Sequence, residues 1–350
     1  MADAGYRVVV FTGRSHGQTT SSVAAAFWYP FAVNGYVRSW AASTYDALMT
    51  LHARGGRTGI HVQKSVEYLD TESDKATREY IDGLWWRELP GIEFEYQGGE
   101  DDPLVGTALD FGPTDTLGCV HFAGAIRFKT LVIHMGRYLD YLVARLNDHG
   151  VGVVPNYWVE KLTHLLDREG FDAVVNCAGY ASESYRWQRS WHGLHPVQGQ
   201  VTSVKAPDVK ELVFVHTGRF DREPLYVVPR APRRRDKRPT DVILGGSLDP
   251  LNSYPTKAVL PAPDLALEQL IMQRCQKIVS ALVDLGPQDI IGSRVGLRPT
   301  AGEVQVGHAI RTWRPIFNNY GHGGGGVSLS WGCAYSIVEK ITDWFDGRRR

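Results

Sequence analysis

The feature that most constrains this sequence is a glycine-rich segment near its end. Five of the six residues from Gly321 to Gly326 are glycines, and the apolar runs on either side predict a strand, a tight turn and a helix over residues 315–339. Glycines let a flat ligand approach the backbone, and a helix N-terminus offers free N–H donors and a partial positive charge. The segment therefore predicts a turn that holds a large ligand, in preference to a turn without one.

The same glycines reproduce part of a dinucleotide-binding fingerprint. Gly321, Gly323 and Gly326 have the G-x-G-x-x-G spacing. The full fingerprint also has a second parallel strand after the helix and an acidic residue about 20 positions further on. The sequence reaches Arg350 before either feature, so we expect this turn to bind its ligand in another way.

The rest of the chain shows helices and short strands in two regions. Residues 6–11 (YRVVVF) follow ADAG, which predicts a helix end and then a buried strand. Apolar residues at helical spacing predict amphipathic helices over 129–147 and 264–282, with VGVV and FDAVVNCAG as strands between them. GQVTSVKAP, ELVFVHT, PLYVVPR and DVILGGSL predict an antiparallel sheet, with residues 230–238 as a solvated hairpin tip.

Charge and composition argue against several classes of protein. The 38 Lys and Arg residues balance 38 Asp and Glu, which gives no reason to expect binding to nucleic acid or to an anionic membrane. No apolar run reaches the ~18 to 20 residues that span a bilayer, and GRRR is not a peroxisomal address, so we expect a soluble, cytoplasmic protein. The four cysteines lie far apart and the 12 histidines lack metal-ligand spacing, so we expect neither a disulfide framework nor a metal.

Two residues on predicted strands are candidates for binding a carboxylate. Arg298 lies in GLRP after a strand-like run, and Tyr226 lies in PLYVVP. If they converge, they would hold a carboxylate by a bidentate ion pair and a phenolic hydrogen bond. Each alone also fits an ordinary surface charge or a packing aromatic, and spacing does not show convergence. His322 in the glycine-rich turn is either an acid or base or a packing residue.

Seven motifs occur in order along the chain: TTSSVAAAFWYPF, VVNCAG, GQV, YVVP, ILGGS, VGLRP and NYGHGGGGVSLSWGCA. Together they resemble the D-amino-acid oxidase family, which includes D-aspartate oxidases, over nearly the whole chain. The resemblance implies an α/β fold with a discontinuous, Rossmann-like FAD-binding domain and an α+β substrate domain built on an antiparallel sheet. We expect residues 1–30, 129–182 and 290–350 to form the first domain and residues 31–128 and 183–289 the second.

The resemblance also implies which residues bind the substrate. Arg298 would pair with the α-carboxylate, and the Tyr226 hydroxyl would assist it. Gly324 would offer its carbonyl group to the amine. Tyr29 and Arg222 would border the substrate.

The implied cofactor is FAD. Ser328 would meet the pyrimidine edge of the flavin, and a helix beginning near Val327 would direct its positive end at the N1/C2=O region. The expected FAD contacts are Arg14, Thr20, Ser21, Ala25, Ala26, Phe27, Val159, Ala178, Gly323, Gly324, Gly325, Gly326, Val327 and Ser328.

The implied reaction is oxidative deamination of a D-amino acid by hydride transfer to flavin N5. The products are a 2-oxo acid, ammonia and, after O₂ reoxidises FAD, hydrogen peroxide. We expect neutral side chains, because Leu248 follows GGS where D-aspartate oxidases tend to place an arginine, although Arg219 or Arg222 offers another partner for an acidic side chain. Oxidation of D-aspartate, glycine or an unusual amine stays open, as do a homodimer and a non-catalytic paralogue without FAD.

The chain departs from the family pattern in three places. The family begins with a strand and a G-x-G-x-x-G turn, which seat the pyrophosphate, before the helix whose tail ADAGYRVVVF resembles. We expect that strand, the turn and most of the helix to be missing here, and we favour a truncated active oxidase that holds FAD weakly. Gly13 stands where an acidic residue binds the adenosine ribose, and Arg222 stands where some relatives have a tyrosine over the substrate.

Overall fold

The computed structural model describes most of the 350 residues. The described ranges are 1–30, 35–71, 73–98, 102–112, 118–167, 169–185, 193–216, 224–230, 241–251, 261–310 and 314–347. Arg219, Arg222 and most of the predicted hairpin tip at 230–238 lie outside these ranges.

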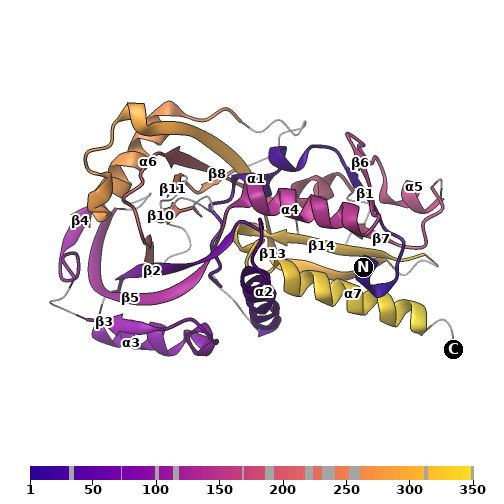
Figure 1. The fold of residues 1–350 in the computed structure, drawn as a ribbon, viewed down its shortest axis with the longest axis horizontal. Coiled ribbons are helices and arrows are strands. Elements are labelled where there is room, and N and C mark those ends of the chain that lie inside the picture. Colours follow the sequence, from indigo (N-terminus) through magenta and orange to yellow (C-terminus); the bar gives the residue numbers. More distant parts are fainter. Residues whose placement is uncertain are drawn as a thin grey trace.

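A mixed sheet of 12 strands runs through the described part of the molecule (Figure 1). Its order is β3-β5-β2-β9-β10-β11-β8-β13-β14-β7, with β4 paired to β5 and β12 to β8. Pairing is antiparallel except for β2 with β9 and β14 with β7. The strands are β2 (Ile60–Asp70), β3 (Glu95–Gln97), β4 (Ala108–Asp110), β5 (Cys119–Ile133), β7 (Val174–Asn176), β8 (His195–Val204), β9 (Leu212–His216), β10 (Leu225–Pro229), β11 (Val242–Gly245), β12 (Asp249–Pro250), β13 (Ile290–Ile310) and β14 (Ile316–His322).

The long strand β13 connects the two regions of the sheet. Its first half pairs with β8 from Ile290 to Thr300, and its second half pairs with β14 up to Ile310. A separate two-stranded parallel sheet is formed by β1 (Val9–Thr12) and β6 (Gly152–Pro155). In Figure 1 this small sheet lies at the same end of the molecule as α7 and the N-terminus.

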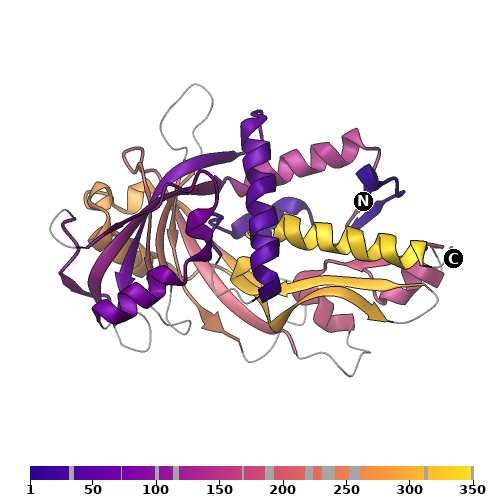
Figure 2. The same ribbon diagram turned by 90° about the horizontal axis from the view of Figure 1, so that it is seen from below.

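Helices cover both faces of the large sheet. They are α1 (Thr20–Val23), α2 (Gly35–Ala53), α3 (Asp74–Asp82), α4 (Met135–Asp148), α5 (Leu162–Asp167), α6 (Leu265–Ile278) and α7 (Ser330–Asp346), with short 3-10 helices η1 (Ala2–Ala4), η2 (His16–Gln18), η3 (Trp85–Glu88), η4 (Gly179–Tyr185), η5 (Ser280–Leu282), η6 (Pro287–Asp289) and η7 (Gly323–Gly325). Figure 2 shows α2 crossing α7. They meet at Gly332, where an added Cβ would lie 2.2 Å from the Trp40 carbonyl oxygen.

The alternation along the strands gives the sheet two cores. On β9, Phe214 packs with Leu131 and α2, whereas Val213 and Val215 pack on the opposite face with α6. Neighbouring side chains on a strand point to opposite faces, so both faces of this strand are buried. Because both faces of β9 are buried, its residues up to Val215 are apolar in succession and do not alternate with polar ones.

Most of the sequence-based elements are confirmed, with shifted boundaries. The runs at 195–245 form an antiparallel sheet, and the helix predicted over 264–282 forms as α6, followed by η5. The two ends of the chain meet, because the Tyr6 hydroxyl lies 3.1 Å from the Thr342 hydroxyl on α7. The division into two domains stays a prediction, and β5 crosses its boundary at residue 129.

The helix predicted over 129–147 is wrong in its first six residues. Residues up to Ile133 continue β5, and α4 begins only at Met135. These residues pair with β2 on one side, and the Trp28 amide donates a 2.7 Å hydrogen bond to the Leu131 carbonyl. Apolar residues buried on both faces fit a strand as well as a helix, so periodicity alone misplaced the boundary.

Candidate active site

Arg298 and Tyr226 come together across the large sheet. Arg298 lies on β13 opposite Val197 of β8, and its Nη1 donates to the Ser247 carbonyl at 3.1 Å and to the Gln198 carbonyl at 3.4 Å. Burial raises the pKa of the Tyr226 hydroxyl, while the charge of Arg298 and a side-chain hydrogen bond to it lower that pKa; the net shift is upward. The phenol therefore stays protonated beside a fixed guanidinium, and both side chains are only half-buried.

Two glycines make room for this pair, and sequence analysis assigned them no role. A Cβ on Gly199 would lie 2.3 Å from Nη1 of Arg298, and a Cβ on Gly245 would lie 2.0 Å from the Tyr226 ring. Both side chains therefore lie flat on the backbone of a neighbouring strand. The signal was present, because Gly199 belongs to GQV and Gly245 to ILGGS, but a glycine motif does not say what lies on it.

The segment from Ala25 to Tyr29 meets the start of the last helix. Ser328 accepts a hydrogen bond from the Tyr29 amide at 3.3 Å, and its hydroxyl donates to the Phe27 carbonyl at 3.5 Å. Ala26 adopts a positive φ of 56°, which turns the chain at this point. The ring centroid of Phe27 lies 6.4 Å from that of Tyr226. The expected flavin contacts are thus adjacent to the expected carboxylate site.

The glycine-rich turn approaches the same place from β14. Gly323 has a φ of 53°, and a Cβ there would lie 3.2 Å from the Thr300 hydroxyl, two residues beyond Arg298 on β13. Gly324 is exposed, and a Cβ on it would meet nothing within 4 Å. Residues 326–329 form turns, so α7 begins at Ser330 and not near Val327 as predicted. The reason is that the first glycines form the short helix η7 before the α-helix starts.

These features fit the isoalloxazine ring of FAD. The small residues Ala25 and Ala26 lie on one side, the open backbone at Gly324 lies on another, and the hydroxyl of Ser328 lies where the two segments meet. Glycines without a Cβ clash and free N–H groups ahead of a helix suit a flat, electron-accepting ring. Together with Gly325, Gly326 and Val327, these residues would hold the ring.

The other expected FAD contacts lie toward the small sheet. The Thr20 hydroxyl donates to the Leu297 carbonyl at 3.1 Å, which ties α1, with Ser21, to β13. Arg14 lies near Tyr180, whose pKa is raised by burial and partly restored by the Arg14 charge. Ala178 is next in the chain to Gly179 at the start of η4, and Val159 packs against the same apolar cluster as Phe11 of β1. Their contacts with FAD stay predictions.

A tryptophan covers Gly13, where the family has an acidic residue. A Cβ on Gly13 would lie 2.9 Å from the Trp158 ring, which is 58% exposed. A longer side chain at position 13 therefore has no space unless Trp158 moves. Sequence analysis noticed the missing acid but had no signal for the aromatic ring that takes its place.

Sequence analysis missed a buried carboxyl group beside the site. Glu67 of β2 has no exposed surface, and its oxygens accept from the Tyr29 hydroxyl at 2.9 Å and the Tyr80 hydroxyl at 2.6 Å. Burial raises the pKa of Glu67 to about 7, because the two phenols compensate only part of the lost hydration. Nδ1 of His216 lies 3.5 Å from the same carboxyl, and burial lowers the pKa of this histidine to about 4.

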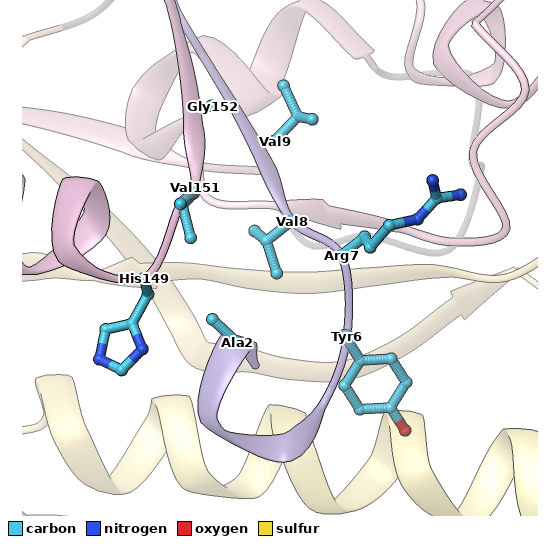
Figure 3. A pocket seen from close by; sticks show the side chains of 9 residues that line it. Ala2, Tyr6, Arg7, Val8, Val9, His149, Val151 and Gly152 are labelled. Carbon is cyan, nitrogen blue, oxygen red and sulfur yellow. The ribbon is translucent and has the colours of Figure 1, made fainter.

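Two other features of the described residues carry no catalytic argument. Burial lowers the pKa of His322 to about 4, so the imidazole is neutral and fits the packing role better than that of an acid. A cavity of about 320 Å³ lies near the N-terminus, beside η1 and the first residues of β1 and β6. Figure 3 shows Ala2, Val8 and Val151 around it and the Arg7 side chain running away from it, so it lacks converging polar groups.

The described ranges hold neither a metal-binding cluster nor a membrane-spanning helix. No group of three or more His, Cys, Asp or Glu residues there could hold a metal ion. Among the helices of the described chain, none is long and apolar enough to cross a bilayer.

Comparison with known proteins shows the family and the fold of this chain. The family described as FAD dependent oxidoreductase (DAO) matches residues 1–340. A D-amino-acid oxidase from Rubrobacter xylanophilus is 31% identical over 337 residues, covering 95% of this chain and 88% of the relative, and one from Streptomyces coelicolor is 26% identical, covering 95% and 89%. Among solved structures, glycine oxidase from Geobacillus kaustophilus covers 98% of this chain and 88% of its own at 17% identity, with a TM-score of 0.70, which shows a shared fold. The chain belongs to the DAO family of FAD-dependent oxidoreductases.

Proposed function

We propose that this protein is an oxidase of D-amino acids that uses FAD and O₂ and gives a 2-oxo acid, ammonia and hydrogen peroxide. The observation that carries the proposal is the Arg298–Tyr226 pair beside the glycine-rich turn. Relatives named D-amino-acid oxidase match along 95% of the chain, which supports the same substrate class. Neutral side chains are the proposed preference.

The pair would fix the substrate through its α-carboxylate. Nη1 of Arg298 is bound to the carbonyls of Gln198 and Ser247, so the guanidinium is held in place with other N–H donors left for a ligand. A planar guanidinium binds a carboxylate through two parallel hydrogen bonds, and the protonated Tyr226 phenol adds a third. The bonds from Arg298 and Tyr226 to the carboxylate would therefore fix the position of the substrate α-carbon in the site.

The chain's remaining groups would orient the amine and keep water away. The exposed backbone at Gly324 provides a carbonyl group that can accept from the substrate amine. The buried rings of Phe27, Tyr29 and Phe214 exclude water from the neighbouring space. When bound, FAD supplies the hydride acceptor and passes the electrons on to O₂. Positioning and electrostatics then carry the reaction without a protein acid or base.

Location and assembly belong to the same proposal. We propose that the protein is located in the cytoplasm and forms a homodimer, although the reaction described above depends on neither. The substrate and O₂ are the only partners that the reaction requires.

The test is anaerobic addition of D-alanine to the purified protein mixed with FAD. We expect flavin absorbance to bleach with D-alanine and to stay unchanged with L-alanine, and admission of air to restore the spectrum with formation of hydrogen peroxide. Bound flavin that no D-amino acid of a panel bleaches would reject the proposed substrate class. A failure to bind flavin at all would fit either a truncated oxidase or the non-catalytic paralogue.

A further inference from the structure

Glu67 lies in the same row of the sheet as Tyr226. In the register, Glu67 of β2 pairs with Phe214 of β9, and Phe214 pairs with Tyr226 of β10. Paired residues on neighbouring strands point to the same face, and strands lie about 4.8 Å apart, so Glu67 is about 10 Å from the Tyr226 backbone. A substrate whose carboxylate is bound at Arg298 and Tyr226 would have its side chain within range of this carboxyl group.

Aromatic rings connect Glu67 to both parts of the site. The Tyr29 ring lies 5.0 Å from Phe214, and its hydroxyl contacts Glu67. The amide of the same Tyr29 donates to Ser328, the expected flavin contact. One residue therefore spans the distance between the flavin position and the buried carboxyl, and the rings of Tyr29 and Phe214 beside Glu67 are each only 3% exposed.

The hydrogen bonds around Glu67 suit a group that can be neutral or charged. Tyr29 and Tyr80 hydroxyl oxygens lie 2.7 Å apart, and each also contacts the carboxyl of Glu67. With Glu67 protonated, three protons can close a ring in which every contact is a hydrogen bond. With Glu67 ionised, only two protons serve the three contacts, but the charge still receives both phenolic donors.

We propose that Glu67 is a specificity-determining residue whose carboxylate makes the substrate site favour neutral and cationic side chains and reject acidic ones. This rests on the proposed function, and it bears on the choice between D-aspartate and neutral D-amino acids. The α-carboxylate is common to all substrates, so its own repulsion cancels when two substrates are compared.

No charged partner among the described contacts offsets the Glu67 charge. The titratable groups that face it are Tyr29, Tyr80 of α3 and His216 of β9. The pKa values of both phenols are raised well above 10, and burial lowers the pKa of His216 to about 4. Between pH 6 and pH 8 only Glu67 of this group changes charge, because burial raises its pKa to about 7.

The test compares D-asparagine with D-aspartate, which are nearly isosteric and differ in charge. In the wild-type holoenzyme we expect the ratio of kcat/KM for D-asparagine over D-aspartate to rise about fivefold from pH 6 to pH 8 as Glu67 ionises. Over this range both substrates keep a protonated amine and D-aspartate keeps an ionised side chain, so substrate titration cancels. Glu67→Gln should lower the ratio at pH 8 to its value at pH 6 and remove the pH dependence.

The control is Glu95→Gln, which neutralises an exposed carboxyl on β3 of the same sheet. It should leave the ratio and its pH dependence as in the wild type. A ratio at pH 8 that is the same in wild type and Glu67→Gln, or a wild-type preference for D-aspartate at pH 8, would overturn the proposal. If Glu67→Gln does not fold, a wild-type ratio that is flat with pH is sufficient to overturn it, and a rise supports it. Oxidation of D-alanine is the separate check on the proposed function.

Discussion

Two regions of this molecule, the flavin and substrate region and the region of the small sheet, are stabilised by different contacts. At the flavin and substrate end, segments distant in sequence are joined by hydrogen bonds, such as Tyr29 to Ser328 and Arg298 to Ser247, around side chains with almost no exposure. At the other end, β1 and β6 form a two-stranded sheet beside a cavity, and Val9 is 39% exposed. Two-stranded sheets are marginally stable by themselves, so this end depends on its neighbours.

The difference shows where the family's chemistry is concentrated in this chain. The large sheet fixes Arg298, Tyr226 and the glycine-rich turn from several strands at once. The expected contacts near the small sheet, such as Arg14 and Val159, lie in loops that follow its two short strands and have exposed neighbours. Changes at the first end should therefore alter catalysis and stability strongly, and changes at the second should alter neither by much.

The largest effect should come from removing the guanidinium of Arg298. Arg298→Ala deletes two charge-assisted hydrogen bonds to the substrate carboxylate, each contributing about 1.5–3 kcal/mol, so kcat/KM for D-alanine should fall by about a thousandfold. FAD affinity, measured by titration of flavin fluorescence, should change less than about threefold, because Arg298 faces the substrate. A decrease of less than tenfold in kcat/KM would mean that the substrate carboxylate is not bound by Arg298.

The contrast in stability can be tested with two apolar truncations. Leu131→Ala removes a side chain with no exposure from the core of the large sheet and should lower the free energy of unfolding by about 3 kcal/mol. Val9→Ala in the small sheet should lower it by less than about 0.5 kcal/mol, because that side chain is partly in water already. Denaturant titration measures both, and equal effects would break the comparison.

The crossing of α2 and α7 gives a smaller effect of a different origin. In Gly332→Ala the new methyl would overlap the Trp40 backbone, and relief by shifting α7 should destabilise the fold by about 2 kcal/mol. Since α7 follows Ser328, the shift should also weaken FAD binding. Gly136→Ala on the exposed side of α4 is the control, expected to be neutral or up to about 1 kcal/mol stabilising. If both variants unfold at the same denaturant concentration, the helix contact is looser than described.

The sequence predicts the individual motifs of the site well, because each motif consists of consecutive residues. GLRP, YVVP and the glycine-rich segment place Arg298, Tyr226 and the turn, because each motif sits on one strand or one strand end. Their convergence comes from the strand order, which no spacing shows, and the resemblance to a known family supplied it. FAD dependence was confirmed by the family match, whereas the residue roles stay predictions.

The burial of Glu67 could not be predicted from the sequence, and the reason is physical. In SVEYLD a glutamate between apolar residues fits a strand with one face in solvent. Its burial beside Tyr29 and Tyr80 brings together segments that meet only in the folded chain. Trp158 over Gly13 is a similar case, because contacts between distant segments leave no periodic signal.

The smallest effect is the contribution of Glu67 to the pH dependence of stability. Its folded pKa of about 7 lies above the model-compound value of 4.5, so the folded state binds the proton more tightly, and stability from this group is lost as pH rises through 7. From pH 6 to pH 8 this should lower the free energy of unfolding by about 1 kcal/mol. Buried histidines such as His61 and His216, whose folded pKa values are about 4, act in the opposite sense over the same range, because the unfolded chain binds their protons.

The overall profile therefore does not isolate Glu67, and the matched variant does. Glu67→Gln keeps the size of the side chain and an acceptor for a tyrosine hydroxyl but cannot ionise. The pKa of His216 is about 4, so this histidine stays neutral in the folded wild type from pH 6 to pH 8. Losing the carboxylate 3.5 Å away can only lower that pKa further, so the histidine contribution should cancel in the difference. The stability of the wild type minus that of the variant should fall by about 1 kcal/mol between pH 6 and pH 8. A flat difference would mean that Glu67 keeps one charge state over this range, and the pH-dependent part of its proposed effect on substrate choice would be lost with it.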